Sequence, residues 1–285
     1  MANKKGKEID NTYLSIDYVE ATGMMHRDYI AHCLRWSHVV KFCQRLKPPA
    51  RILDIGCGIE LNLPKLLRSS RVAFDYYAGV DHGKVDAKKY FNKSGKGWEP
   101  DKIWANTDFL DIPDEQLDKI NLMACFEVLE HVEPTHAIKM LEKMKKNLAP
   151  DGNLFVSTPC YDARLGAADN HVNEITYEAM GSLLETSGFA IENHYGTFAS
   201  QRDYKDYLTE PQKIVFEGLS KYYESNMLST IFAPLHPSRS RNCIWHCKHQ
   251  TALYSKLFPR IDELQTPLGS SNNWQDMLKI NMYKL

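Results

Sequence analysis

The sequence lacks an excess of charge of either sign, because 35 Lys and Arg residues stand against 36 Asp and Glu residues and leave a net charge of -1. No overall positive field draws the chain to a nucleic-acid backbone or an anionic membrane. No apolar run is long enough to span a bilayer, and no secretory h-region follows the basic start at Lys4, Lys5 and Lys7. The seven cysteines are odd in number and scattered, unlike a disulfide framework. We therefore expect a cytoplasmic protein without a membrane partner.

Short apolar runs alternate with stretches of helical spacing through most of the chain. This alternation predicts βαβ units and an α/β fold, with a mainly parallel sheet between layers of helices and ligands at the carboxyl ends of the strands. The expected strands are 51–55, 76–81, 102–106, 120–126, 153–157, 189–195 and 243–248. The expected helices are 61–68, 84–92, 134–148, 177–187 and 211–223, with one or two more within 12–46. Residues 149–152, Ala-Pro-Asp-Gly, predict a turn before the fifth strand.

The length of 285 residues suits one large domain with appendages. We assign a helical cap to residues 1–49 and the central α/β domain to residues 50–249. Within that domain, residues 197–242 are rich in Tyr, Ser and Pro and are expected to form an insertion on the substrate side. Residues 250–285 are expected to form a loosely packed tail.

A glycine-rich turn, Asp54-Ile55-Gly56-Cys57-Gly58, joins the first expected strand to the helix after it. Glycine lets backbone N–H groups approach a ligand closely, so the turn predicts a ligand site. Taken alone, the same turn is also typical of a phosphate or dinucleotide site.

Polar residues follow the next three strands. Asp81 comes about 20 residues after the turn, the usual spacing for a carboxylate that binds ribose hydroxyls. After the third strand, Asp108 is placed to accept from an adenine amino group while Phe109 packs against the base. After the fourth strand the chain reads Cys-Phe-Glu-Val-Leu-Glu-His, residues 125–131.

These segments resemble the class I S-adenosylmethionine-dependent methyltransferases, in particular small-molecule enzymes with a D-x-G-C-G first motif and an E-V-x-E-H fourth motif. The resemblance covers residues 50–248, and residues 146–154 are similar to the family's loop before its fifth strand. It implies a three-layer αβα sandwich with a seven-stranded sheet whose last strand is antiparallel. It also implies S-adenosylmethionine as cofactor and S-adenosylhomocysteine as product.

The resemblance implies a role for each part of the site. The glycine turn would line the methionine part of the cofactor, Asp81 the ribose, Asp108 and Phe109 the adenine, and the fourth motif the sulfonium. The expected cofactor-binding residues are Asp54, Gly56, Cys57, Gly58, Asp81, His82, Thr107, Asp108, Phe109, Phe126, Glu127 and His131. One position departs from the family pattern, because Glu60 stands where a third glycine is usual, and an inward carboxylate there would repel the cofactor's own.

Three side chains near the carboxyl ends of the strands are candidates for a general base. His131 follows the fourth strand, and its alternative role is to hydrogen-bond the backbone of its own loop. His171 precedes the helix that begins near Thr176, and in relatives an H-x-x-E segment of this kind lies near the acceptor pocket. Its alternative role is to pack on the helix cap made by Glu174 and Thr176. Tyr161 is the third candidate, and it fits a pocket wall as well as a base.

The grouping of Cys243, His246, Cys247 and His249 is not expected to bind zinc, because alternate residues of a strand face opposite sides. No metal site is therefore predicted. The favoured function is methyl transfer to an oxygen or nitrogen of a small metabolite or nucleotide. Two alternatives stay open: a cofactor-binding partner or regulator without turnover, and a nucleic-acid base modifier. The latter is disfavoured because no Asn/Asp-Pro-Pro-Tyr/Phe motif follows the fourth strand.

Overall fold

The computed structural model describes residues 21–22, 27–46, 49–85, 99–117, 119–198, 205–223 and 225–250. Its strands are β1 (Ala50–Ile55), β2 (Phe74–Asp81), β3 (Lys102–Ala105), β4 (Ile120–Phe126), β5 (Leu148–Pro159), β6 (Phe189–Phe198) and β7 (Asn242–His249). Its main helices are α2 (Arg27–Cys43), α3 (Asn62–Ser69), α5 (Pro134–Asn147), α6 (Tyr177–Thr186), α8 (Glu210–Leu219) and α9 (Ser225–Phe232).

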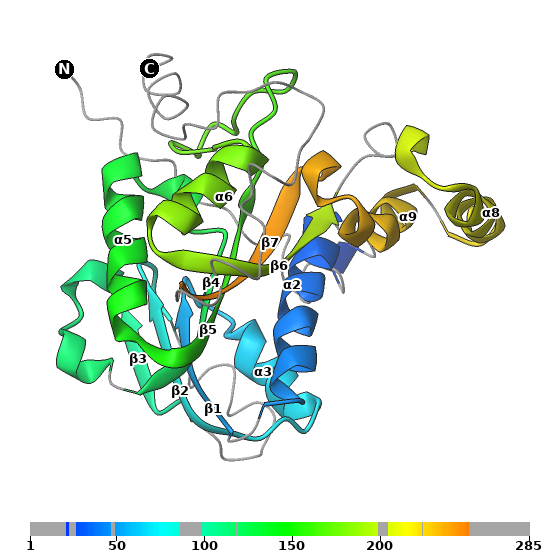
Figure 1. The fold of residues 1–285 in the computed structure, drawn as a ribbon. Helices are drawn as coiled ribbons and strands as arrows, with labels where there is room; N and C mark the ends of the chain where they lie inside the picture. Colours follow the sequence, from blue (N-terminus) through cyan, green and yellow to red (C-terminus); the bar gives the residue numbers. More distant parts are fainter. Residues whose placement is uncertain are drawn as a thin grey trace.

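The seven strands form one sheet in the order β3-β2-β1-β4-β5-β7-β6. The pairs from β3 to β5 are parallel, and β7 runs antiparallel to both β5 and β6. The sheet lies between helices on its two faces (Figure 1). The predicted α/β sandwich, its seven strands and its antiparallel last strand are thus confirmed.

Alternation along the strands divides the core between the two faces. In β1, Leu53 and Ile55 pack with the buried residues of α5 and α6, whereas Ile52 packs with those of α2 and α3. A strand covered on both faces needs apolar residues at consecutive positions, and the sequence of β1 provides them. The loops that contain the sequence motifs lie at the sheet edge formed by the carboxyl ends of the parallel strands.

The structure corrects the turn expected at residues 149–152. Strand β5 begins at Leu148, directly after α5, and these four residues lie within it. They leave the regular register, because Ile120 pairs with Leu148 and the next pair joins Leu122 to Asn153, which advances β4 by two residues and β5 by five. The Pro-Asp-Gly sequence therefore produces a bulge within the strand rather than a separate turn.

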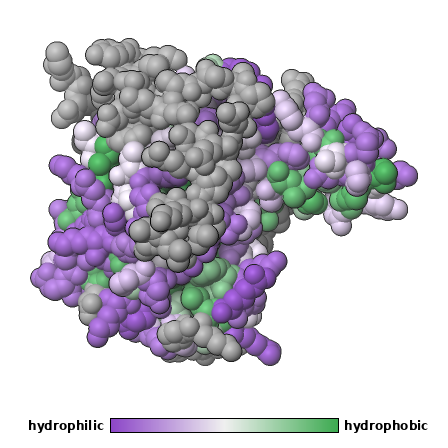
Figure 2. Space-filling model, viewed as in Figure 1, coloured by the Kyte–Doolittle hydropathy of each residue, from purple (hydrophilic) through white to green (hydrophobic). Residues whose placement is uncertain are grey.

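Some expected elements fall wholly or partly outside the described residues, among them the start of the helical segment 12–46, most of the helix at 84–92, and the tail at 250–285. In the insertion, the helix expected at 211–223 is shorter and is followed by α9, which the sequence pattern did not predict. The two helices have a small core of their own around Leu228 and Phe232. Helix α8 projects from the rest of the domain, whereas α9 contacts α2 and β6, and apolar side chains are visible on the surface of this region (Figures 1 and 2).

A search of the described helices finds none with the length and apolar character needed to cross a bilayer.

Candidate active site

The glycine-rich turn after β1 is held against β2. Gly56 and Gly58 have φ angles of 73° and 69°, in the left-handed region that favours glycine. The Gly56 and Cys57 amides both donate to the carbonyl of Val80, at 2.8 and 3.2 Å. A Cβ at Gly56 would clash with Val128 Cγ2, whereas a Cβ at Gly58 would meet no atom of the described residues within 4 Å. The backbone at Gly58 thus faces open space in which a ligand can approach it.

Asp81, the last residue of β2, braces this turn. Its Oδ2 accepts from the Gly58 amide at 2.9 Å, and its Oδ1 accepts from the Gly83 amide at 2.7 Å. A carboxylate oxygen has more than one lone pair, so these bonds leave acceptor capacity for ligand hydroxyls. The structure therefore gives Asp81 a second task, shaping the turn, besides the expected contact with ribose.

Asp54 lies beneath the turn at the end of β1, with 5% of its surface exposed. The Tyr77 hydroxyl donates to its Oδ2 at 2.7 Å. Burial raises the pKa of Asp54 from 3.8 to about 7; the hydrogen bond from Tyr77 lowers the pKa in part, and the charge of Asp81 adds to the rise. Burial raises the pKa values of the Cys57 and Cys125 thiols, and the charge of Asp54 adds to the rise in both.

We expect Asp54 to make the protein less stable as pH rises. Its pKa is higher in the folded chain than in the unfolded chain, so between about pH 4 and 7 the folded state binds more protons than the unfolded state. The free energy of unfolding therefore falls as pH rises through this range. Asp54→Asn keeps an acceptor for Tyr77 and removes the titration. In urea unfolding from pH 4 to 8, the free energy of unfolding of the variant should rise relative to that of the wild type, by up to about 4 kcal/mol at the highest pH. Parallel pH profiles for the two proteins would contradict this.

The segment after β3 is anchored at both ends. The Thr107 amide donates to the carbonyl of Asp81 at 3.1 Å. Asp108 Oδ1 accepts from the Leu110 amide at 2.8 Å, and its Oδ2 lies 3.1 Å from His136 Nε2. His82, whose side chain is 67% exposed, has its Nε2 3.7 Å from the same Oδ2. Asp108 and His82 therefore lie together, beside the end of β2.

Phe109 does not fit the position expected for it. The residue is 2% exposed and belongs to the core under α5, where Lys143 Nζ lies 5.4 Å from the centre of its ring. A ring buried to this extent has little surface left to stack on an adenine. Its large apolar area instead stabilises the 3₁₀ turn Phe109–Asp111 against the core.

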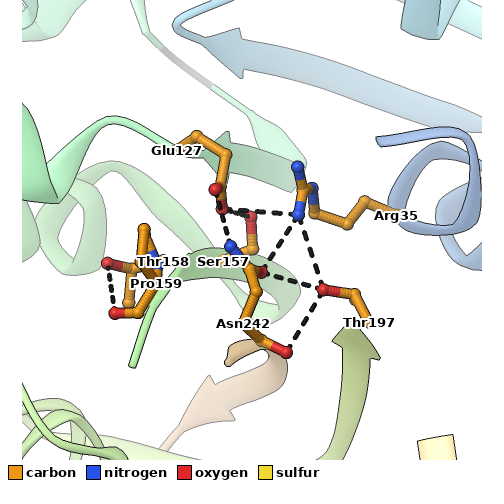
Figure 3. A network of polar contacts seen from close by, with 7 residues as sticks. All are labelled: Arg35, Glu127, Ser157, Thr158, Pro159, Thr197 and Asn242. Atoms are coloured by element: carbon orange, nitrogen blue, oxygen red, sulfur yellow. Dashed lines mark hydrogen bonds and ion pairs between the residues drawn. The ribbon is translucent and has the colours of Figure 1, made fainter. Parts of the chain in front are cut away.

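Glu127 is the centre of a polar network that joins the sheet to α2 (Figure 3). Its φ angle of 57° is unusual for a residue other than glycine. Oε1 accepts from Ser157 Oγ at 2.7 Å, and Oε2 accepts from Asn242 Nδ2 at 2.6 Å. Arg35 Nη1 lies 3.6 Å from Oε1 and donates to Asn242 Oδ1 at 3.0 Å. The side chain of Glu127 is 18% exposed, so it keeps a small surface at the sheet edge. Its neighbour Phe126, 7% exposed, packs in the core.

Arg35 was missed by the sequence analysis. It is 1% exposed, between Ala31 and Val39, which are also buried on the same face of α2. The sequence did carry a signal, because Arg35 has an apolar residue four positions before it and another four positions after it. A residue at such a position shares the core-facing side of the helix with these neighbours. Without an alignment or a structure, nothing in the sequence points to Glu127 and Asn242 as its partners.

The structure brings together two of the three expected bases. The rings of His131 and His171 have centroids 4.7 Å apart and lie nearly perpendicular. His131 Nδ1 lies 3.2 Å from the carbonyl oxygen of Asn170, and His171 Nδ1 contacts Glu174 Oε1. Burial, followed by the nearby His171, lowers the pKa of His131. Tyr161 follows β5, and its amide donates to the carbonyl of Ile175 at 2.8 Å.

The residues of β7 alternate as predicted. Cys243 and Cys247 pack in the core on the α5 and α6 side, whereas the ring of His246 stacks on Phe155 on the other side, with centroids 4.4 Å apart. His246 Nε2 pairs with Asn153 Oδ1 at 2.8 Å. Burial lowers the pKa of His246 to about 4, so its imidazole is neutral at pH 7.

Comparison with known protein families assigns the chain to a class of protein that agrees with its fold and with the residues at the carboxyl ends of its parallel strands. A family model described as a methyltransferase domain matches residues 26–209, and the chain belongs to that family. The resemblance drawn from the motifs is thereby confirmed. No curated protein sequence matches the chain.

Several solved structures share the fold. They include the small RNA methyltransferase HEN1 (TM-score 0.54, 19% identity, covering 77% of this chain and 26% of that one). The 1,6-didemethyltoxoflavin-N1-methyltransferase of Burkholderia thailandensis has a TM-score of 0.50 at 15% identity over 84% of this chain and 88% of that one. An O-methyltransferase from a trans-AT PKS multienzyme of Brevibacillus brevis has a TM-score of 0.50 at 15% identity over 98% and 92%. The chain spans only 52% and 26% of two of the structures it matches.

Proposed function

We propose that this protein binds S-adenosylmethionine and transfers its methyl group to an oxygen or nitrogen of a small metabolite or nucleotide. The proposal rests chiefly on one observation, that two groups of residues lie at the same edge of the sheet, where the parallel strands end. One is the glycine turn braced by Asp81, with open space at Gly58. The other is the pair of imidazoles of His131 and His171. Membership of the methyltransferase-domain family supports it.

The residues around the turn fit the cofactor. Gly58 offers backbone without a side chain in the way, and Asp81 offers acceptors for ribose hydroxyls. Asp108 and His82 lie next to each other where an adenine would follow the ribose. When bound, the cofactor supplies an electrophilic methyl group. The 1,6-didemethyltoxoflavin-N1-methyltransferase and the PKS O-methyltransferase named above contain S-adenosylhomocysteine, which agrees with this assignment for the fold.

The protein's own part in the reaction is to hold the acceptor and to take its proton. Transfer to an O–H or N–H group releases a proton, and an imidazole with a pKa near or below neutrality accepts it well. We assign this task to His171 or His131, with Tyr161 as the third candidate. Glu127 stays fixed by Ser157, Asn242 and Arg35 at the end of β4.

The test is transfer of radiolabelled methyl from S-adenosylmethionine to a panel of hydroxyl- and amine-bearing metabolites and nucleotides. With an accepted substrate, His171→Gln should lower kcat about 100-fold or more while cofactor affinity is retained. His249→Gln is the matched control, because His249 Nε2 pairs with the carbonyl of Leu148 at the opposite edge of the sheet. Cofactor binding with no transfer to any acceptor would favour a regulator without turnover, and no cofactor binding would end the proposal.

An RNA acceptor is the second candidate, because one of the matched structures is a small RNA methyltransferase. The balanced net charge of the chain argues for a small acceptor instead. Binding of single-stranded RNA that weakens steeply with salt would favour the RNA candidate, and no binding at low salt would remove it.

A further inference from the structure

The insertion between β6 and β7 has an apolar surface. Ten large apolar side chains are exposed in the described part of the chain, and seven of them lie between residues 207 and 235. Three belong to α8 and the turn after it: Ile214, Val215 and Tyr222, which are 71%, 53% and 82% exposed. Apolar side chains are visible on this projecting region in Figure 2. Exposed apolar surface that gathers in one place marks an interaction site more often than an ordinary protein surface.

Helix α8 has two faces of different character. On its inner face, Phe216 packs edge-on against Phe232 of α9, with ring centroids 5.5 Å apart, and Leu219 lies against the same small core. The helical path continues past Leu219, because the Tyr223 amide donates to the carbonyl of Leu219 at 3.0 Å. Exposed apolar or small residues recur every three to four positions on the opposite side, which we call the outer face. The outer face consists of Pro211, Ile214, Val215, Gly218 and Tyr222.

Gly218 lies in the middle of the outer face. Glycine inside a helix is destabilising relative to alanine, because it loses more conformational freedom on folding. A Cβ at Gly218 would meet no atom of the described residues within 4 Å, so packing within this part of the chain does not require glycine there. The missing side chain leaves room for a side chain of a second helix to approach the backbone beside Val215.

Charged side chains flank the outer face on one side. Glu210, the first residue of α8, and Lys221, two residues after its last, are eleven residues apart, about three helical turns, so they share that side. Glu210 Oε1 accepts from Lys213 Nζ at 2.6 Å, which leaves Oε2 for a second cation. Glu217 lies further round the helix, where Lys213 one turn earlier offsets its charge. The flank of the outer face thus has an acid at one end and a base at the other.

This arrangement of charge is complementary to a second α8 that runs in the opposite direction. Antiparallel pairing about a twofold axis that sets Val215 of each copy opposite Gly218 of the other brings Glu210 within two positions, about 3 Å along the helix, of the other copy's Lys221. Parallel pairing would instead place Glu210 beside Glu210 and Lys221 beside Lys221. Charge therefore favours the antiparallel pair and disfavours the parallel one.

We propose that the outer face of α8 is the contact surface of a symmetric dimer, in which it packs antiparallel against the outer face of α8 in a second copy of this chain. Such a contact uses the same patch on both copies, and apolar positions every three to four residues pack as in a coiled coil. A pair of single helices buries less than the roughly 800 Å² per partner of a standard interface, so we expect a dissociation constant of about 10 µM.

The test is sedimentation velocity of the full chain, without cofactor or acceptor, from about 1 to 300 µM, on either side of the expected dissociation constant. Val215→Glu should raise that constant about 100-fold or more, because it places charges at the centre of the contact. Leu165→Glu is the matched control and should leave the constant unchanged, since Leu165 is 64% exposed in the loop between β5 and α6. A monomer at every concentration would overturn the proposal, as would a dimer that Val215→Glu does not weaken.

Charge reversal tests the direction of the pairing. Glu210→Lys and Lys221→Glu should each weaken self-association about 10-fold, because each places like charges opposite one another. An equimolar mixture of these two variants should associate as tightly as the wild type, since both contacts then join an acid to a base. Circular dichroism establishes that each variant is folded. A mixture that associates no better than its components would overturn the antiparallel pairing.

A lipid surface is the competing occupant of the outer face. Binding of the chain to phosphatidylcholine vesicles that is lost in Val215→Glu would assign the outer face to a membrane surface and overturn the dimer. The proposed dimer does not depend on the proposed methyl transfer. Because sedimentation is measured without cofactor or acceptor, failure of either proposal leaves the other standing.

Discussion

Replacing Arg35 with methionine is expected to lower the free energy of unfolding by about 3 kcal/mol. The guanidinium is buried, donates to Asn242 Oδ1 at 3.0 Å and lies 3.6 Å from Glu127 Oε1. Methionine fills much of the same space but leaves the Glu127 carboxylate without a counter-charge, and that loss, rather than a cavity, dominates the expected effect. Urea unfolding followed by circular dichroism measures the change.

Lys41→Met is the control for this prediction, because Lys41 lies on the exposed face of the same helix. It should change stability by no more than about 0.5 kcal/mol. The double variant with Glu127→Gln should be less destabilised than the sum of the two single variants, by about 1 kcal/mol or more. Equal effects of Arg35→Met and Lys41→Met would show that the network in Figure 3 does not hold α2 against the sheet.

Replacing Asp81 with alanine is expected to weaken binding of S-adenosylmethionine and S-adenosylhomocysteine about 100-fold, the equivalent of losing two hydrogen bonds to a charged group. The variant removes the ribose acceptor of the proposed site. It also releases the Gly58 and Gly83 amides, which Asp81 holds at 2.9 and 2.7 Å. Calorimetric titration with both ligands measures the effect.

Asp75→Ala provides the comparison, because Asp75 is an exposed carboxylate near the opposite end of the same strand, β2. Its affinity for both ligands should match the wild type. Asp81→Asn, which keeps one acceptor oxygen, should lie between the wild type and Asp81→Ala. An Asp81→Ala protein that is folded and binds both ligands normally would mean that the cofactor does not use the end of β2.

The order and type of the main elements could be predicted from sequence because they depend on local pattern. Apolar residues at consecutive positions, such as Ile52 and Leu53 in β1, predict a strand buried on both faces. The glycine turn after β1 requires the positive φ angles found at Gly56 and Gly58. The same logic failed at residues 149–152, where the turn-forming sequence is a bulge within β5. The residues that flank it are held in the sheet, because Leu148 pairs with β4 and Asn153 pairs with both β4 and β7.

The cofactor half of the candidate site was also within reach of sequence. Each of these side chains or turns lies at or just after the end of a parallel strand, and a parallel sheet brings the ends of its strands to one edge: Asp54, Gly58, Asp81 and Asp108. What the side chains do there was not predictable. Phe109 lies in the core, and Asp81 supports the glycine turn besides its proposed contact with ribose. Burial and hydrogen bonding depend on neighbours that are distant in sequence.

By itself, the sequence determined the α/β fold, the position of the candidate ligand-binding edge and the family to which the chain belongs, because periodicity and motif spacing are properties of consecutive residues. Only the tertiary structure decided that Arg35 from α2 meets Glu127, and that Glu130 and His131 meet His171, 40 residues later than His131. These contacts join segments that are distant in sequence. The side chains become buried, and their charges and hydrogen bonds take effect, only when the sheet and its covering helices assemble.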